Sequence, residues 1–505
     1  MIRVSRQLVF FVLAGLALQH LVIYLVWTFF AHDTPGRIHW LRAEDSQRLR
    51  GRITVVIRDF NEAVNDLHAT SSSLSATDAV QKVLIVSDRK LYPAVTFTSP
   101  KVEQFQLHPD LRLGREWKDL RKHIATEWVM LVPDGVVLDP AAFDFDDILR
   151  SIREDGDNIR AWGFRIRGKR ASCHSIHLDH KQWTLYSNSS VGPVCDSITG
   201  SLVHLTRAPD YLALFDPLAQ PVDESLQIQF ASLAWKFRLL ERTPFTRSDR
   251  LLDPEVLKLL RVVRDEQLKS LYDQFDIKRV VKNSNEEIFG CKKYTKRCFG
   301  DVINEMPSYV YEGRVTPPCC VRALRNVLQH VIDVFNTNDV RYWLEGGSLL
   351  GAARNGELIP WDYDIDLGMY LNDTKQVQFL QAANEGPVED VDGFVWEKSS
   401  ASEGQFYRVH YSKTNRMHVD IFPFYSNDST MTKDYWFATH PQDKEFPERF
   451  LLPLETVSFM GLTVSSPNNV REFLELKFGK GCIENPKFPH DLVASSTTLQ
   501  STSSP

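Results

Sequence analysis

The sequence has little cysteine and no excess of positive charge. Seven cysteines in 505 residues are too few for a scaffold built on disulfides. The 59 Lys and Arg are outnumbered by 65 Asp and Glu, a formal net charge of −6, which argues against nucleic-acid binding through bulk positive charge. Apolar and charged shares of 43% and 25% exclude a mainly disordered or collagen-like chain. The length indicates two folded domains.

One long apolar run lies near the N-terminus. Leu8–Phe30 has 23 residues without a formal charge, and roughly 20 are needed to cross a bilayer. A cleaved signal peptide, the alternative, has a shorter run and a small-residue cleavage site. Arg3 and Arg6 precede the run, which favours a cytoplasmic N-terminus. We predict a cytoplasmic tail and signal-anchor helix over residues 1–31, a tether over 32–51, and a lumenal remainder.

Residues 52–287 have the pattern of an α/β domain. Three apolar runs alternate with more polar helical segments: Ile53–Ile57, Val83–Val86 and Trp128–Val132. This order predicts a parallel sheet and resembles the nucleotide-sugar-binding half of a GT-A glycosyltransferase. The Asp-x-Asp metal motif of such enzymes is missing, because Pro133-Asp134-Gly135 offers one carboxylate in a turn. We expect a GT-A-like stem without its own catalysis, ending in a connecting helix over Asp253–Gln274.

A cysteine pair and a glycosylation sequon in this stem agree with a lumenal location. Cys173 and Cys195 lie 22 residues apart, and in an oxidising compartment such a pair favours a disulfide over two free thiols. Asn188-Ser189-Ser190 lies in a polar stretch and is the predicted N-glycosylation site. Two further sequons begin at Asn372 and Asn427.

Four cysteines cluster where the second half of the chain begins: Cys291, Cys298, Cys319 and Cys320. Four thiolates can hold zinc in a tetrahedral site, but an adjacent pair is not a standard zinc-finger spacing. Two disulfides are the alternative in a lumenal protein, and spacing alone slightly favours them.

A glycine turn in the second half has the features of a phosphate site. Gly346-Gly347-Ser348 lies between a predicted strand over 341–345 and a predicted helix. In such a turn backbone N–H groups can approach a phosphate, with the helix dipole behind them.

Acidic residues downstream strengthen this interpretation. Asp364 and Asp366 alternate in a strand-like run and so share one face, and Asp420 lies in a second such run, Met417–Phe422. Neighbouring carboxylates repel one another unless a hard cation lies between them, and Mg²⁺ or Mn²⁺ is the usual one. A glycine-serine turn, paired acids and a third acid on a neighbouring strand are typical of a polymerase-β-like nucleotidyltransferase.

Longer stretches around these residues resemble the LicD-type phosphotransferases. The matching segments are Arg341–Arg354, Ile359–Gly368, Gly393–Lys398, Val419–Phe424, Met431–Asp434, Pro467–Asn469 and Phe473–Gly479. The resemblance covers residues 289–490 closely and the stem more loosely. It implies a catalytic domain over 288–494 with a zinc-binding loop at the four clustered cysteines, which reverses the preference for disulfides drawn from spacing.

Within that family the residues are most similar to those of the Golgi branch that transfers ribitol 5-phosphate. The resemblance implies CDP-ribitol as donor and a ribitol-phosphate-bearing O-mannosyl glycan of α-dystroglycan as acceptor. It also implies a homo-oligomer formed with the help of a non-catalytic stem. The Ser/Thr-rich tail over 495–505 lacks a core pattern and is predicted to be disordered.

The implied reaction is a substitution at phosphorus, in which an acceptor hydroxyl attacks and CMP leaves. Asp364 and Asp366 would hold Mg²⁺ on the diphosphate, and Asp420 would complete the metal site or help to deprotonate the hydroxyl. The other candidates are Gly347 and Ser348 for the donor phosphate, Arg354, Arg408 and Lys413 for donor or acceptor phosphates, and Asp362 behind the metal ligands. Two rival functions are a lumenal nucleotidyltransferase, which would release pyrophosphate, and a non-enzymatic glycan-binding scaffold.

Overall fold

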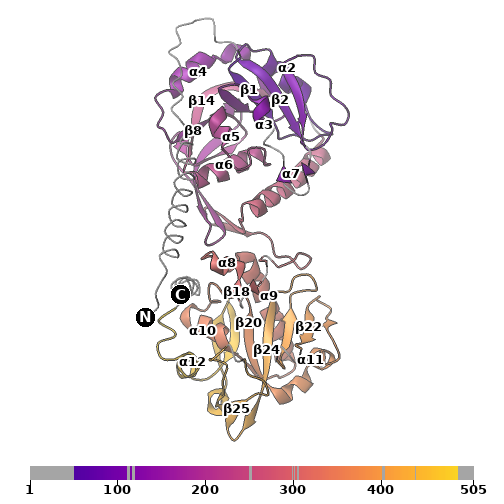
Figure 1. Cartoon of the computed structure of the whole chain (residues 1–505), viewed down its shortest axis with the longest axis vertical. Helices are drawn as coiled ribbons and strands as arrows, with labels where there is room; N and C mark the ends of the chain where they lie inside the picture. Colours follow the sequence, from indigo (N-terminus) through magenta and orange to yellow (C-terminus); the bar gives the residue numbers. More distant parts are fainter. Residues whose placement is uncertain are drawn as a thin grey trace, which may run out of the picture. The chain divides into compact units, whose positions relative to one another are not determined.

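The computed structural model describes residues 51–486, except 108, 111–113, 116–119, 249–252, 298, 301, 304–305, 401–403 and 438–439 (Figure 1). The predicted signal-anchor, nearly all of the tether, the tail and Cys298 lie outside the described residues. Within the described ranges, no helix combines the length and apolar character that a membrane crossing requires.

The N-terminal half is built on a mixed sheet. β1 (Ile53–Ile57) pairs in parallel with β2 (Val80–Ser87) and with β6 (Trp128–Leu131), so the three strands predicted from apolar runs are confirmed. β1 and β6 are buried along their whole length, which explains their continuous apolar sequence. The predicted parallel pairing of these three strands is confirmed, and the sheet as a whole is mixed because β13 (Leu202–Arg207) runs antiparallel to β6.

Further strands and helices complete this half. In the same sheet β13 also pairs with β8 (Ile159–Ile166), and β8 with β14 (Lys236–Arg247). The remaining elements are β3 (Val102–Gln106), β4 (Pro109–Asp110), β5 (Gly114–Arg115), β7 (Val136–Leu138), α2 (Leu67–Ser75), α3 (Leu120–His123), η2 (Pro140–Ala142), α4 (Phe145–Ile152), α5 (Ala208–Leu212) and α6 (Val222–Ser232).

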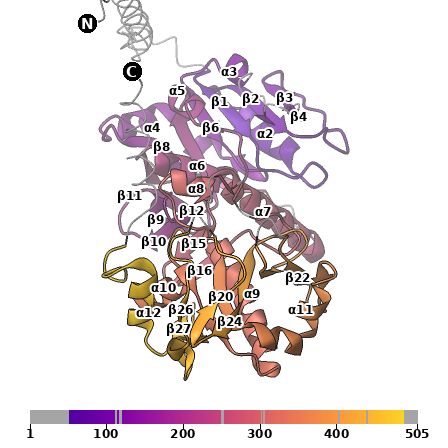
Figure 2. The same cartoon turned by 60° about the horizontal axis from the view of Figure 1, so that its bottom comes forward.

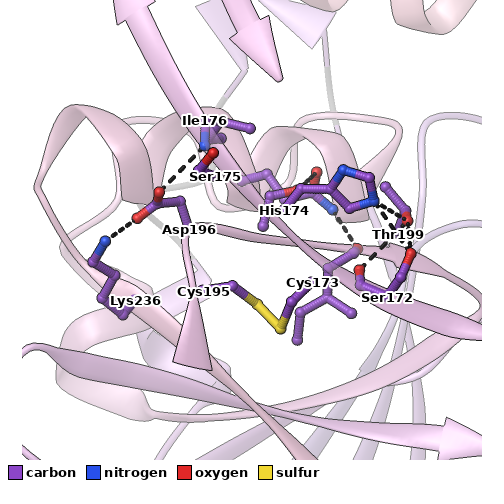
Figure 3. Close-up of a disulfide and its surroundings, with 12 residues drawn as sticks. Ser172, Cys173, His174, Ser175, Ile176, Cys195, Asp196, Thr199 and Lys236 are labelled. Atoms are coloured by element: carbon purple, nitrogen blue, oxygen red, sulfur yellow. Dashed lines mark hydrogen bonds and ion pairs between the residues drawn. A yellow bond between two sulfur atoms is a disulfide. The ribbon is translucent and has the colours of Figure 1, made fainter. Parts of the chain in front are cut away.

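A disulfide joins this sheet to a second one (Figure 3). Cys173 in β9 (Ala171–Asp179) is bonded to Cys195 in β11 (Val194–Cys195), with an S–S distance of 2.14 Å and a Cα–Cα distance of 5.5 Å. β11 pairs with β14 of the first sheet, whereas β9 pairs with β10 (Thr184–Ser189) and β12 (Ser197–Gly200) of the second. β15 (Arg279–Lys282) and β16 (Asn285–Ile288) extend the second sheet.

The predicted connecting helix is α7 (Pro254–Gln274). Its first turn is capped by Asp253, whose side chain accepts a hydrogen bond from the Glu255 N–H at 2.8 Å. Only Leu271 and Tyr272 of this helix are buried. Several of the apolar side chains of this helix are therefore exposed rather than packed in a core.

The C-terminal half has its own sheet, in the order β19–β20–β24–β23–β22–β21. Its strands are β19 (Tyr342–Leu344), β20 (Ile365–Tyr370), β21 (Val388–Glu389), β22 (Val395–Lys398), β23 (Tyr407–His410) and β24 (His418–Asn427). β20 and β24 are parallel, and the other neighbouring pairs are antiparallel. The amphipathic helix α9 (Pro318–Thr337) packs against β24 (Figures 1 and 2).

The remaining elements of this half include two short strands, β25 (Thr430–Thr432) and β26 (Phe446–Pro447), that extend the sheet from β24. α10 (Gly346–Asn355) follows β19 directly and contacts β20 and α12 (Val470–Phe478). The others are β17 (Val302–Ile303), β18 (Met306–Pro307), α8 (Ser308–Tyr311), η3 (Leu371–Gln376), α11 (Gln378–Ala382), η4 (Glu448–Leu451), β27 (Glu455–Phe459) and β28 (Leu462–Ser466).

Candidate active site

The glycine turn at the start of α10 makes room for two carboxylates. A Cβ added to Gly346 would lie 2.8 Å from Oδ2 of Asp366, and one added to Gly347 would lie 2.8 Å from Oδ2 of Asp362. Gly346 also has φ of +53°, a conformation that favours glycine. The pair of glycines is therefore required by the acids that lie against the helix N-terminus.

Ser348 lies in the predicted turn, with its side chain directed at the first residues of β20. Its side chain is buried, and its Oγ accepts a hydrogen bond of 2.9 Å from the backbone N–H of Asp366. Ser348 does not line the cavity in front of the acids, whereas Gly347 does. The side chain of Ser348 thus holds the start of β20, and the predicted contact of this residue with donor phosphate stays a prediction.

The predicted acids converge at the centre of the sheet. Asp366 in β20 and Asp420 in β24 are register partners on adjacent parallel strands, and Asp364 immediately precedes β20. One ligand atom each from Asp364, His418 and Asp420 lies within 4.8 Å of the others. His418 is two residues before Asp420 and so shares its strand face. The sequence analysis did not propose it as a ligand.

The acids raise one another's proton affinity. Burial, followed by the charges of neighbouring carboxylates, raises the pKa of Asp362 and Asp366 well above the usual range. Burial also raises the pKa of Asp364, and the charge of Asp420 adds to this shift. Crowded carboxylates of this kind are stabilised by a cation among them. The carboxylate oxygens of this cluster are donors that fit Mg²⁺ or Mn²⁺.

Arg408 is part of this cluster. It lies opposite Asp420 on β23, and its Nε and a terminal nitrogen donate to the two carboxylate oxygens of Asp420 at 2.6 and 2.7 Å. This fork-like pairing fixes both side chains. Arg408 also lines the cavity in front of the acids, so it has the location predicted for a phosphate contact.

The cavity in front of the acids has a volume of about 920 Å³. It is lined by Val302, Glu345, Gly346, Gly347, Asp362, Tyr363, Asp364, Asp366, Phe406, Arg408, Asp420, Phe422, Phe424, Lys433, Tyr435, Phe437, His440, Gln442, Asp443 and Phe478. This volume lies within the range of pockets that bind small molecules.

Two of the predicted basic residues do not reach this cavity. Arg354 donates hydrogen bonds to the backbone oxygens of Cys482 and Ile483, at 2.6 and 3.2 Å. Lys413 is 71% exposed and forms an ion pair with Glu389 at 2.6 Å. Their predicted contacts with phosphate are therefore not supported by their positions.

Sequence reasoning missed several residues that line the cavity. Glu345 accepts from Trp343 Nε1 at 2.8 Å and pairs with Lys477 at 2.7 Å, so its carboxylate is held on two sides. Lys433 lies in the cavity wall beside Asp443. The only signal for Lys433 was its place in the Met431–Asp434 segment of the family resemblance, and no signal pointed to Asp443.

Three of the four clustered cysteines are close together in the structure. One ligand atom each from Cys291, Cys319 and Cys320 lies within 4.8 Å of the others, and the sulfur atoms of Cys291 and Cys320 are 3.2 Å apart. All three are buried. This proximity agrees with a shared zinc ion, whereas the structure has Cys320 in a disulfide. The fourth cysteine, Cys298, lies outside the described residues.

The predicted glycosylation site is accessible. Asn188 is near the end of β10 and is exposed. Attachment of a glycan there remains a prediction.

Comparison with known proteins identifies both halves of the chain. The family model "LicD/FKTN/FKRP, nucleotidyltransferase domain" matches residues 339–469, and the "Fukutin-related protein stem domain" matches residues 41–283. The first range contains the converging acids, and the second contains the mixed sheet of the N-terminal half.

Curated relatives match over most of the chain. Ribitol 5-phosphate transferase FKRP of Homo sapiens is 39% identical over 474 residues, which cover 91% of this chain and 95% of that protein. The Mus musculus protein of the same name matches with the same identity and coverage. Ribitol-5-phosphate transferase FKTN of Homo sapiens is 25% identical over 176 residues, 34% of this chain and 36% of that protein. The chain belongs to the fukutin-related protein family.

Proposed function

We propose that the protein transfers ribitol 5-phosphate from CDP-ribitol to a ribitol-phosphate-bearing O-mannosyl glycan of α-dystroglycan and releases CMP. The observation that carries the proposal is the convergence of Asp364, Asp366 and Asp420 on one cavity, in a chain whose relative of 39% identity is named for ribitol 5-phosphate transfer.

In the proposed reaction an acceptor hydroxyl attacks the phosphorus that carries ribitol. The new bond joins the hydroxyl oxygen to this phosphorus, the bond from phosphorus to the CMP oxygen breaks, CMP leaves with that oxygen, and the hydroxyl proton is released to solvent. Such catalysis depends mainly on positioning and on neutralising the charge of the phosphates. The residues of the cavity must therefore hold donor and acceptor in line.

Asp364, Asp366 and Asp420, with His418 beside them, are the residues that would hold Mg²⁺ or Mn²⁺. When bound, the cation would supply neutralisation of phosphate charge. Nδ1 of His418 lies 2.9 Å from the backbone oxygen of Arg416, which leaves Nε2 on the side of Asp420, 3.9 Å from its Oδ2. Ser348 holds the backbone N–H of Asp366, and Gly346 leaves room for its carboxylate.

Asp420 is a poor candidate for the group that accepts the hydroxyl proton. Both of its oxygens already accept hydrogen bonds from Arg408. Each oxygen keeps a lone pair for a metal ion, because a carboxylate oxygen has two. We therefore favour the metal-binding role of Asp420 over the role of a base.

One product assay separates this proposal from its rivals. The protein is incubated with Mg²⁺, CDP-ribitol and the phosphorylated glycan, and in parallel with CTP and ribitol 5-phosphate. CMP from the first mixture supports the proposal. Pyrophosphate from the second indicates a nucleotidyltransferase, and no product from either indicates a glycan-binding scaffold.

The proposal includes a location and an assembly. We place the protein in the Golgi membrane as a single-pass type II protein with a lumenal catalytic domain and a GT-A-like, non-catalytic stem. A homo-oligomer formed through the stem is supported by four apolar side chains of α7 that are exposed: Leu257, Leu259, Val262 and Val263. Exposed apolar groups gathered on one element are typical of an interface.

We also propose a structural zinc ion at Cys291, Cys298, Cys319 and Cys320. The support is the closeness of the three described sulfur atoms and the family resemblance. A closed zinc site would contribute folding energy to the loop between these cysteines.

A further inference from the structure

The cavity in front of the acids contains many more negative than positive side chains. Its carboxylates belong to Glu345, Asp362, Asp364, Asp366, Asp420 and Asp443, and its fixed cations to Arg408 and Lys433. A donor with two phosphates brings further negative charge into this space. Besides a metal ion, the binding of such a donor therefore depends on these two cations.

Arg408 and Lys433 differ in what their donors already bind. The Nε and one terminal nitrogen of Arg408 are engaged by both oxygens of Asp420. Lys433 forms an ion pair with one oxygen of Asp443, at 2.8 Å. An ammonium group has three N–H donors, and this contact uses one of them.

Aromatic rings hold the Lys433 ammonium at the cavity wall. The ring centroids of Phe422, Phe437, Trp436 and Phe424 lie 4.6, 5.2, 5.0 and 5.4 Å from its Nζ. At these distances the ring faces attract a cation. Lys433 as a whole is only 9% exposed, so a contact made by its ammonium is weakly screened by water.

Asp443 binds the ammonium from the other side. Its Oδ2 accepts a hydrogen bond of 2.9 Å from the Phe437 N–H, which leaves Oδ1 for Lys433. Burial lowers the pKa of the Lys433 ammonium, and the charge of Asp443 opposes this shift. An anion bound in the cavity would favour the charged form in the same way.

We propose that Lys433 is a donor-binding residue, whose ammonium donates a hydrogen bond to a phosphate oxygen of the nucleotide diphosphate. The four aromatic rings position it for this contact, and Asp443 competes with the phosphate for one of its N–H donors. The choice of a cytidine diphosphate as ligand rests on the proposed function. Lys477 is a useful contrast, because it is also buried and ion-paired, with Glu345 at 2.7 Å, but does not line the cavity.

The test measures equilibrium binding of CDP and of cytidine to the full-length protein in detergent at one Mg²⁺ concentration. We expect Lys433→Met to weaken CDP binding by about 10- to 100-fold, the range of a hydrogen bond between charged groups, and to leave cytidine binding unchanged. Lys413→Met is the matched control, since it removes the same charge from an exposed position outside the cavity. It should bind CDP like the wild type.

Asp443→Asn separates phosphate binding from a purely structural ion pair. If Lys433 binds phosphate, removing its competing carboxylate should leave CDP binding unchanged or tighter. If the ion pair only maintains the fold, this variant should lose CDP binding as Lys433→Met does. That loss, or an equal loss of CDP and cytidine binding in Lys433→Met, overturns the proposal. Asp443→Asn decides the question alone if Lys433→Met does not fold.

The outcome is independent of the proposed transfer reaction. Wild-type protein that binds CDP through Lys433 but releases no CMP from CDP-ribitol would refute the reaction and keep this inference. Active protein in which Lys433→Met binds CDP normally would refute the inference and keep the reaction.

Discussion

Replacement of Ser348 by alanine tests whether this residue holds Asp366 or contacts donor phosphate. Its Oγ accepts the backbone N–H of Asp366 at 2.9 Å, and the side chain is 1% exposed. Alanine removes the acceptor and admits no water in its place. The N–H of Asp366 is then left buried without this partner, at the start of the strand that carries the acid.

The magnitude follows from the loss of one buried hydrogen bond. An orphaned buried donor costs about 1–3 kcal/mol of unfolding free energy, and each kcal/mol lowers the melting temperature of a domain of this size by about 2–4 °C. If Asp366 relaxes by a few tenths of an ångström, the rate also falls, because a misplacement of about 1 Å can cost about 100-fold. We therefore expect a lower melting temperature together with a kcat reduced about tenfold or more.

The assay measures kcat, KM for CDP-ribitol and the melting temperature of the same preparation. Ser225→Ala is the matched control, because Ser225 is also buried and its Oγ accepts a hydrogen bond of 2.8 Å from Gln229, far along the chain in the N-terminal half. It should lower the melting temperature and leave both kinetic constants unchanged. A Ser348→Ala variant with wild-type stability and kcat, but a raised KM, would refute the positioning role and restore the predicted phosphate contact.

Three further predictions concern the metal sites and pH. Asp364→Ala and Asp366→Ala should each abolish transfer while circular dichroism shows an intact fold, since both carboxylates line the cavity and are among the residues proposed to hold the metal ion. Near-normal turnover in either variant contradicts the role proposed for that residue. Elemental analysis of protein purified without added metal should find one zinc per chain. Cys320→Ser should make the segment from Cys291 to Pro318 more susceptible to proteolysis, because a bound zinc ion contributes folding energy. Disulfides mapped among these cysteines by mass spectrometry, without zinc, would contradict the proposed zinc site. The hydrogen bond from His410 lowers the pKa of Glu397 to about 2, from 4.5. The stability that this carboxylate contributes is therefore present above pH 4.5 and lost as the pH falls from 4.5 towards 2. The melting temperature of Glu397→Gln should fall less steeply than that of the wild type in this window, and an equal slope would contradict the contribution of Glu397 to stability.

The strands and the convergence of the acids could be predicted because they depend on local pattern. Apolar runs such as Ile53–Ile57 mark strands buried on both faces, and alternation places Asp366 and Asp364 together. The pairing of Asp366 with Asp420 was predicted only through the known arrangement of nucleotidyltransferases. Spacing in the chain does not determine which strands become neighbours.

Other features depend on contacts between distant segments and were missed for that reason. Ser348 and Arg354 belong to the same helix, but one turns towards β20 and the other towards the backbone near Cys482. A sequence pattern identifies the helix but not the partner of each face. The antiparallel direction of β13 could likewise not be predicted from the sequence, because strand direction follows from the path of the connecting segments.

Lys433 illustrates a third kind of limit. A lone lysine in a short run of polar and aromatic residues is most often a surface charge. Its burial follows from rings contributed by β24 and by the segment that contains Trp436 and Phe437, and from Asp443 further along the chain. Only the folded arrangement shows that this ammonium belongs to the cavity.

The most direct test of the account is the mass of the acceptor glycan after incubation with CDP-ribitol and Mg²⁺. Wild-type protein should add one ribitol phosphate to a glycan that already carries one and release an equal amount of CMP, whereas Asp366→Ala should add none. A glycan of unchanged mass with folded, metal-loaded wild-type protein would contradict the account, as would equal addition by wild-type protein and Asp366→Ala.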